Sequence, residues 1–103
     1  MRIERWEPER DGPLSEHALR RKLRKLGYLA TRYHYPPGTI FDEHAHDVDE
    51  IDAILSGRFR MEMEGRSIEL GAGDTLYVPR GTMHRAAVVG DEPVVSLDAV
   101  RRE

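Results

Sequence analysis

The sequence predicts an all-β domain, an antiparallel sandwich or barrel, with one short helix near its N-terminal end. Downstream of Gly27, apolar and polar residues alternate through several short segments, and a period of two is typical of half-buried strands. Corners rich in glycine and proline separate these segments at regular intervals, as they do in antiparallel sandwiches and barrels. The chain has 103 residues, which is enough for one such domain and leaves no room for a second core.

The segment with helical periodicity covers residues 15–26. Its apolar positions recur at i, i+4 and i+7, and they are Leu19, Leu23 and Leu26. Ser15 is a suitable N-cap and Gly27 a suitable left-handed C-cap, so the sequence marks both ends of this helix. The opposite face is basic, and we interpret it as a solvated face whose cations suit the C-terminal end of the helix dipole. Contact with phosphate or nucleic acid is the alternative interpretation.

The predicted strands follow the helix, and each is bounded by a turn signal. They cover residues 29–35, 48–55, 59–63, 67–70, 75–78, 84–89 and 94–100. The polar residues 1–13 end in a turn signal, Asp11-Gly12-Pro13, and no strand or helix is predicted there. We therefore assign residues 1–28 to an N-terminal segment that contains the basic amphipathic helix, and residues 29–103 to the β domain.

The composition excludes several classes of protein. Sixteen basic and nineteen acidic residues give a net charge of −3, which argues against a general nucleic-acid binder. Cysteine is absent, so disulfides and thiolate metal sites are excluded. The apolar runs are too short to cross a bilayer, and the N-terminus lacks the apolar stretch of a signal peptide. We therefore expect a cytoplasmic protein without a membrane partner.

An acidic stretch from Asp42 to Asp52 surrounds two histidines, His44 and His46. These histidines are two residues apart, so in a strand their imidazoles point to the same side. Glu50 has the same parity and, if the strand continues, faces the same interior. Imidazole and carboxylate ligands without thiolate suit a divalent ion of Mn, Fe, Co, Ni or Zn better than Ca or Mg.

The spacing of glycines around these residues resembles the two sequence motifs of the cupin superfamily. The first motif is G-x5-H-x-H-x3-E-x6-G, and its fixed positions are Gly38, His44, His46, Glu50 and Gly57. The second is G-x5-P-x-G-x2-H, and its fixed positions are Gly73, Pro79, Gly81 and His84. Val88 departs from the family pattern, which places an asparagine at this position. That asparagine is not a metal ligand in the family, so the departure does not affect coordination.

This resemblance implies that residues 29–103 form a jelly-roll barrel of two packed antiparallel sheets. It also implies a centre that binds one divalent transition metal ion, with the ligands His44, His46, Glu50 and His84. In the six-coordinate geometry usual for the family, two positions stay open for water or substrate. An open position is what separates a catalytic metal from a structural one. A homodimer is a further expectation from the resemblance.

Asp52 is the candidate catalytic residue. It shares the parity of Glu50, so we expect it to face the interior, near the metal without binding it, where it can act as a general acid or base. Asp98 is expected to face inward in the last strand. Burying a carboxylate costs free energy unless the group is paired or hydrogen-bonded. The competing prediction is therefore structural, with Asp52 paired to an arginine such as Arg60 or Arg85.

The predicted function is metal-dependent chemistry on a small polar molecule, of the dioxygenase or isomerase kind. The alternative is a module that binds or senses a small molecule through its metal without turnover. An acid or base beside the metal favours the enzyme, whereas a purely apolar pocket wall favours the binding module. Nucleic acid is not an expected partner. The residues that line the pocket therefore decide between the enzyme and the binding module.

Overall fold

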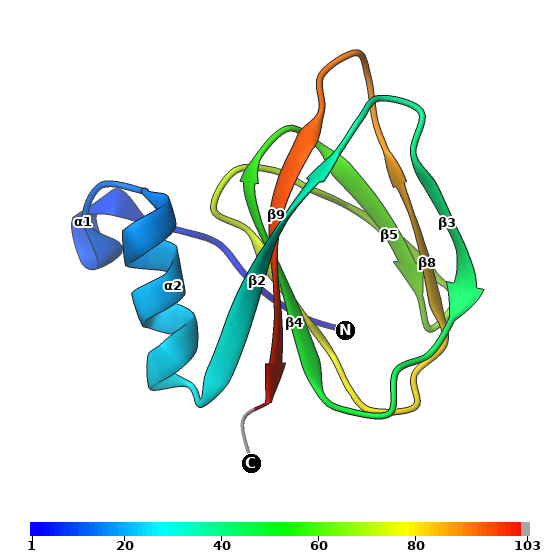
Figure 1. Cartoon of the computed structure of the whole chain (residues 1–103), viewed down its shortest axis with the longest axis horizontal. Coiled ribbons are helices and arrows are strands. Elements are labelled where there is room, and N and C mark those ends of the chain that lie inside the picture. The colour runs from blue at the N-terminus through cyan, green and yellow to red at the C-terminus, as the bar shows by residue number, and fades with distance from the viewer. Residues whose placement is uncertain (102–103) are drawn as a thin grey trace.

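The computed structural model describes residues 1–101, which form two antiparallel sheets facing each other (Figure 1). The five-stranded sheet has the order β1 (Arg2–Glu4), β7 (Thr75–Val78), β4 (Glu50–Ser56), β9 (Val94–Arg101) and β2 (Tyr28–Tyr35). The four-stranded sheet has the order β3 (Ile40–His44), β8 (His84–Val88), β5 (Phe59–Met63) and β6 (Arg66–Leu70). The helices α1 (Pro8–Asp11) and α2 (Glu16–Lys25) lie outside the five-stranded sheet. The predicted class, an antiparallel all-β domain with a short N-terminal helix, is confirmed.

Two apolar clusters hold these layers together. The first packs between the sheets and includes the buried Ile54. The second joins α2 to the outer face of the five-stranded sheet, where Leu19 and Leu23 pack with Ile51. Because successive side chains of a strand point to opposite faces, β4 is buried on both sides. Asp52, next to Ile51, therefore turns toward the space between the sheets.

The helix α2 begins and ends where the sequence marks it. Ser15 Oγ accepts a hydrogen bond of 3.0 Å from the backbone N–H of Ala18, and Gly27 adopts a left-handed φ of +90°. Leu26 departs from the prediction, because its side chain is 43% exposed. It is the C-cap residue and lies beyond the last helical turn, so it leaves the apolar stripe that packs on the sheet.

The basic face of α2 is only partly solvated. Lys22 Nζ lies 2.7 Å from Glu4 Oε1 in β1, and Arg20 Nη1 donates a hydrogen bond of 2.9 Å to the carbonyl of Ala30 in β2. The prediction of a solvated face therefore holds for the exposed Arg24 and is wrong for Arg20 and Lys22. These two cations connect the helix to the sheet.

The first residues of the chain carry two elements that the sequence did not predict. β1 pairs antiparallel with β7, with Ile3 opposite Leu76, and α1 begins at Pro8. A strand of three residues is too short to show alternation, so only its pairing partner defines it. Trp6 follows β1, and its Nε1 donates a hydrogen bond of 2.8 Å to the carbonyl of Gly12. Within residues 1–101, no helix is both long enough and apolar enough to span a membrane.

Replacing Ser15 with alanine should lower the free energy of unfolding by about 1 kcal/mol, the usual cost of losing a side-chain N-cap. The N–H of Ala18 then loses its acceptor, while the leucines of α2 still pack on the sheet. Urea unfolding followed by circular dichroism measures the change. Ser15→Asp is the matched control, because aspartate caps a helix as well as serine does. Equal losses in both variants would contradict a capping role.

Candidate metal centre

Three histidines come together at one end of the space between the sheets. His44, the last residue of β3, lies opposite His84, the first residue of β8, and His46 follows in the loop before β4. The ring centroids of His44 and His84 are 4.2 Å apart, and that of His46 lies 4.9 Å and 5.0 Å from them. One ligand atom from each ring lies within 4.8 Å of the others, so the three side chains could hold one metal ion.

Backbone carbonyls orient two of these imidazoles. His44 Nδ1 lies 2.7 Å from the carbonyl oxygen of Asp42, and His84 Nδ1 lies 3.0 Å from that of Thr82. Because a carbonyl oxygen only accepts, each Nδ1 carries the proton and donates it, which leaves the lone pair on Nε2. This is how proteins commonly fix the tautomer of a metal-binding histidine. The donor set therefore fits a divalent transition ion.

The loop that carries His46 is fixed by the corner before β8. The carbonyl of His46 accepts a hydrogen bond of 2.9 Å from the N–H of Gly81, and the N–H of Arg80 donates to Asp49 Oδ1, also at 2.9 Å. Gly81 has a φ of +78°, a conformation that favours glycine. The corner of the second motif thus holds the loop of the first motif in place, which gives the fixed spacing in both motifs a physical reason.

Glu50 reaches the histidines from the other sheet. Its Oε2 lies 3.3 Å from His46 Nε2, and its side chain is largely buried. Strand parity would bring Glu50 to His44 and His46 only if one strand continued through all three, and it does not, since β3 ends at His44 and β4 begins at Glu50 in the opposite sheet. A loop that crosses between the sheets, rather than strand parity, brings Glu50 to the histidines. The compact group is formed by the three histidines, and Glu50 lies at its edge beside His46.

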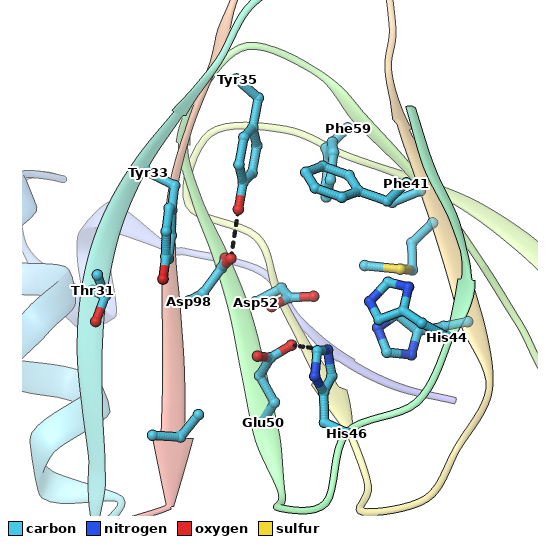
Figure 2. Close-up of a pocket in the computed structure, with 14 residues that line it drawn as sticks. Thr31, Tyr33, Tyr35, Phe41, His44, His46, Glu50, Asp52, Phe59 and Asp98 are labelled. Carbon is cyan, nitrogen blue, oxygen red and sulfur yellow. Dashed lines mark hydrogen bonds and ion pairs between the residues drawn. The ribbon is translucent and has the colours of Figure 1, made fainter. Parts of the chain in front are cut away.

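These side chains lie at one end of a cavity of about 290 Å³ between the sheets (Figure 2). The cavity is lined by Thr31, Tyr33, Tyr35, Phe41, His44, His46, Glu50, Asp52, Phe59, Met61, His84, Ala86, Asp98 and Val100. The far end is aromatic. The ring of Tyr35 lies 4.9 Å from that of Phe41 and 5.7 Å from that of Phe59, measured between centroids. A ligand in this cavity therefore meets the histidines at one end and apolar rings at the other.

Asp52 lies in the cavity wall between these two ends, as its parity predicts (Figure 2). It is 5% exposed and lies directly opposite Asp98 in the pairing of β4 with β9. Burial, and then the neighbouring carboxylates of Asp98 and Glu50, raise the pKa of Asp52 well above its ordinary value. Its Oδ1 is buried and has no hydrogen-bond partner among the described residues.

The predicted pairing of Asp52 with an arginine is wrong. Arg85 pairs with Glu62, and both side chains lie on the outer face of the four-stranded sheet. Arg60 is exposed and belongs to the same outer face, because the alternation of β5 turns its neighbour Met61 inward. Strand parity separates both arginines from the cavity.

Asp98 faces the cavity as expected and is held by two hydroxyl groups. Its Oδ2 accepts a hydrogen bond of 2.7 Å from the Tyr35 hydroxyl, and its Oδ1 accepts one of 2.6 Å from Ser96 Oγ. Burial and the Asp98 carboxylate raise the pKa of Tyr35 far above its ordinary value, so this hydroxyl stays protonated and donates. The sequence left the direction of Tyr35 open. The pairing of β2 with β9 places Thr31 opposite Asp98 and Tyr35 opposite Val94, so Tyr35 reaches the acid only through its long side chain.

The protonation of His84 also suits metal binding. Burial lowers its pKa below the ordinary value, an effect that the nearby His44 and His46 reinforce. The neutral imidazole is the form that binds a metal. His17 and His34 are exposed and do not line the cavity. Val88, where the family pattern has asparagine, packs in the apolar cluster between the sheets.

The fold and this centre define the class of protein. Residues 31–100 match the family described as the cupin domain, and the chain therefore belongs to the cupin family. Solved cupin structures share its architecture, so the jelly roll implied by the sequence motifs is confirmed. A cupin protein from Bacteroides fragilis, for example, has a TM-score of 0.64 and 29% identity, covering 74% of this chain and 66% of that chain.

Individual relatives differ widely in what they do. The nitrosourea synthase of Streptomyces achromogenes subsp. streptozoticus is 36% identical over 66 residues, which are 63% of this chain and 14% of the relative. The bifunctional lysine-specific demethylase and histidyl-hydroxylase NO66 of Branchiostoma floridae is 41% identical over 66 residues, 60% of this chain and 11% of the relative. The chain thus spans only a small part of the length of these curated relatives.

Among solved structures, oxalate decarboxylase of Bacillus subtilis, described with Mn(II) centres, has a TM-score of 0.65 and 29% identity. The match covers 74% of this chain and 22% of that chain. KdgF from Halomonas sp. has a TM-score of 0.64 and 27% identity, covering 75% of this chain and 71% of that chain. The family is therefore established for this chain, and its three clustered histidines could bind a metal ion, whereas the relatives differ in the activities that their names give.

Proposed function

We propose that the protein is a metal-dependent cupin that acts on a small polar molecule in the cavity between its sheets. In this proposal His44, His46, Glu50 and His84 bind one divalent transition ion. The observation that carries it is the orientation of the histidines. In two of them Nδ1 donates a hydrogen bond to a backbone carbonyl, which leaves Nε2 free to bind an ion. The Mn(II) centres named for oxalate decarboxylase support the same assignment.

When bound, such an ion supplies Lewis acidity, which polarises an oxygen atom of the ligand. The residues of the chain contribute the rest. Asp52, beside Glu50 in the cavity wall, is the group that we assign to proton transfer with the ligand. Tyr35 and Ser96 hold Asp98 in a fixed orientation, and the rings of Phe41 and Phe59 keep water from the far end of the cavity.

The cavity wall also bears on the choice between an enzyme and a binding module. A module without turnover requires only apolar walls around the metal, whereas an enzyme requires an acid or base beside it. Asp52 and Asp98 both line the cavity, and Asp52 is buried at a cost in free energy. These two carboxylates support chemistry of the dioxygenase or isomerase kind over simple binding or sensing.

Metal analysis of the purified protein tests this proposal first. The metal-free protein is then reconstituted separately with Mn, Fe, Co, Ni and Zn ions, and the ion that binds one equivalent is carried into a panel of small polar substrates. Turnover by the loaded protein is the expected result. Failure to bind any of these ions would contradict the proposal, and stoichiometric binding without turnover of any panel compound would favour the sensing module.

The affinity for the ion should fall as the pH drops below about 6.5, the ordinary pKa of imidazole, because a protonated ring cannot bind metal. The lowered pKa of His84 keeps this ring neutral, and so able to bind the ion, to a lower pH than an ordinary imidazole. Competition with a chromophoric chelator across this pH range measures the effect. An affinity that does not depend on pH would argue against histidine ligands.

A further inference from the structure

Apart from its three histidines, the wall of the cavity carries acidic and no basic residues among those that the structure describes. Glu50, Asp52 and Asp98 line it, and neither lysine nor arginine is among the lining residues that the structure describes. If Glu50 is a metal ligand, Asp52 and Asp98 remain as two carboxylates without a cationic partner. Within residues 1–101, neither of them forms an ion pair with a lysine or an arginine. A cationic group that enters beside the metal site therefore meets two acidic side chains that have no cationic partner among the described residues.

Asp52 and Asp98 form a cross-strand pair of acids in which one carboxylate oxygen lacks a hydrogen-bond partner in the protein alone. They lie directly opposite each other on β4 and β9, an arrangement that is unfavourable for two like charges. Asp98 is held by the hydroxyls of Tyr35 and Ser96, but Asp52 Oδ1 is buried without any partner. An unpaired buried acceptor costs free energy, and a donor from a ligand would remove this cost.

Aromatic rings border the same pair of carboxylates. Tyr33 and Tyr35 stack with centroids 5.9 Å apart, and both line the cavity beside Asp98 (Figure 2). Tyr33 is 44% exposed, so it borders the cavity where solvent reaches it. The negative face of an aromatic ring attracts an organic cation, and it adds to the attraction of nearby carboxylates.

We propose that Asp52 and Asp98, bordered by Tyr33 and Tyr35, bind the protonated primary amine of the small molecule that occupies this cavity. The ammonium N–H groups would donate to Asp52 Oδ1 and to the lone pairs that Asp98 still has free. The subsite lies next to the proposed metal ligands. The inference rests on the proposed function, because it takes the amine to be a group of the substrate. An anionic substrate group would instead face the carboxylates, and its binding would be penalised.

Three probes of the same chain length test the subsite: n-butylammonium, 1-butanol and butyrate. Each is titrated at about pH 7, where the amine is fully protonated, into isotope-labelled protein, both metal-free and zinc-loaded. The chemical shifts of backbone amides give the dissociation constants. We expect n-butylammonium to bind at least about tenfold more tightly than either of the other probes, as charge-assisted hydrogen bonds and ring contact require.

Two variants locate the preference, and a third serves as the control. Asp52→Asn and Asp98→Asn should each remove most of the preference for n-butylammonium, whereas Asp91→Asn, at an exposed turn outside the cavity, should leave it unchanged. Asparagine keeps the shape of aspartate, so these variants are expected to fold. Equal binding of the three probes, a preference for butyrate, no binding of n-butylammonium, or a preference that survives both cavity variants would overturn the subsite.

The metal-free and metal-loaded titrations separate this inference from the proposed function. Binding of n-butylammonium to a protein that takes up no metal ion would leave the amine subsite intact and refute the metal centre. Uptake of one ion without any preference for n-butylammonium would leave the metal centre intact and refute the subsite.

Discussion

Replacing His84 with alanine should weaken the binding of a divalent transition ion by more than about 100-fold. Loss of even an outer hydrogen-bond partner of a metal-binding imidazole usually costs 10–100-fold in affinity, so loss of the imidazole itself should cost more. His84 is 2% exposed, and its Nδ1 is already engaged with the Thr82 carbonyl. Its side chain is thus held in place before any ion binds, and the variant removes an oriented ligand. Metal content after dialysis and a chelator competition measure the change.

His17→Ala is the matched control, because His17 is exposed on α2 and does not line the cavity. It removes an imidazole from the same chain and should leave the affinity for the ion unchanged. His44→Ala should behave like His84→Ala, since the two rings lie opposite each other in the register of β3 and β8. A metal content that stays the same in both His44→Ala and His84→Ala would show that the centre lies elsewhere.

The candidate site could be predicted from the sequence because its motifs record contacts between distant segments. The spacing around His44 and His46 reflects a loop whose backbone is bonded to the corner at Gly81. Our physical explanation of the convergence was nevertheless wrong in part. The parity argument for Glu50 required one strand to continue from His44 to Glu50, and the chain instead crosses from one sheet to the other between these residues. Five intervening residues do not reveal by periodicity whether a strand continues or bends.

Asp52 shows the same division between local and tertiary information. Its inward direction follows from strand alternation, which the sequence displays. The identity of its neighbour cannot be predicted in this way. The pairing of β4 with β9 places Asp98 opposite Asp52, and the register between distant strands leaves no local pattern in the sequence. The sequence did hold a signal against Arg60, since the apolar Phe59 and Met61 on either side already place this arginine on the other face.

The N-terminal segment was the least predictable part of the fold. The leucine stripe and the cap at Ser15 were sufficient to predict α2. β1, in contrast, is a strand only because it pairs with β7, and α1 is a single turn that begins at Pro8. Elements of three or four residues are defined by what they contact, so composition and periodicity carry little information about them.

Asp52→Asn should stabilise the metal-free protein, and the gain should grow as the pH rises. Burial and the neighbouring Asp98 and Glu50 raise the pKa of Asp52 in the folded state above its value in the unfolded chain. The folded protein therefore holds this proton more tightly. The resulting stability is complete below the ordinary pKa of aspartate, about 3.9, and is lost as the pH rises through the raised value. Asparagine does not titrate and escapes this loss.

Urea unfolding of the two metal-free proteins between about pH 4 and about pH 8 measures this difference. The gap in free energy of unfolding should widen by no more than about 1.4 kcal/mol per pH unit, the limit for a single titrating group. Asp91→Asn removes an exposed carboxylate and should give a curve parallel to that of the unchanged protein. Parallel curves for Asp52→Asn as well would contradict a raised pKa.

The same variant tests the role that we propose for Asp52 in proton transfer. Asparagine keeps the shape of the side chain and can still accept a hydrogen bond, but it cannot take up or release a proton. Loaded with the same ion, Asp52→Asn should keep its fold and its metal and lose turnover of any substrate that the panel identifies. A carboxylate that is buried without a partner at Oδ1 destabilises the fold, and a role toward the ligand, as the partner of its amine or in proton transfer, would explain why the chain carries it. If the variant instead loses stability while activity per folded molecule stays intact, Asp52 has a structural role, and the binding module becomes the better description of this cupin.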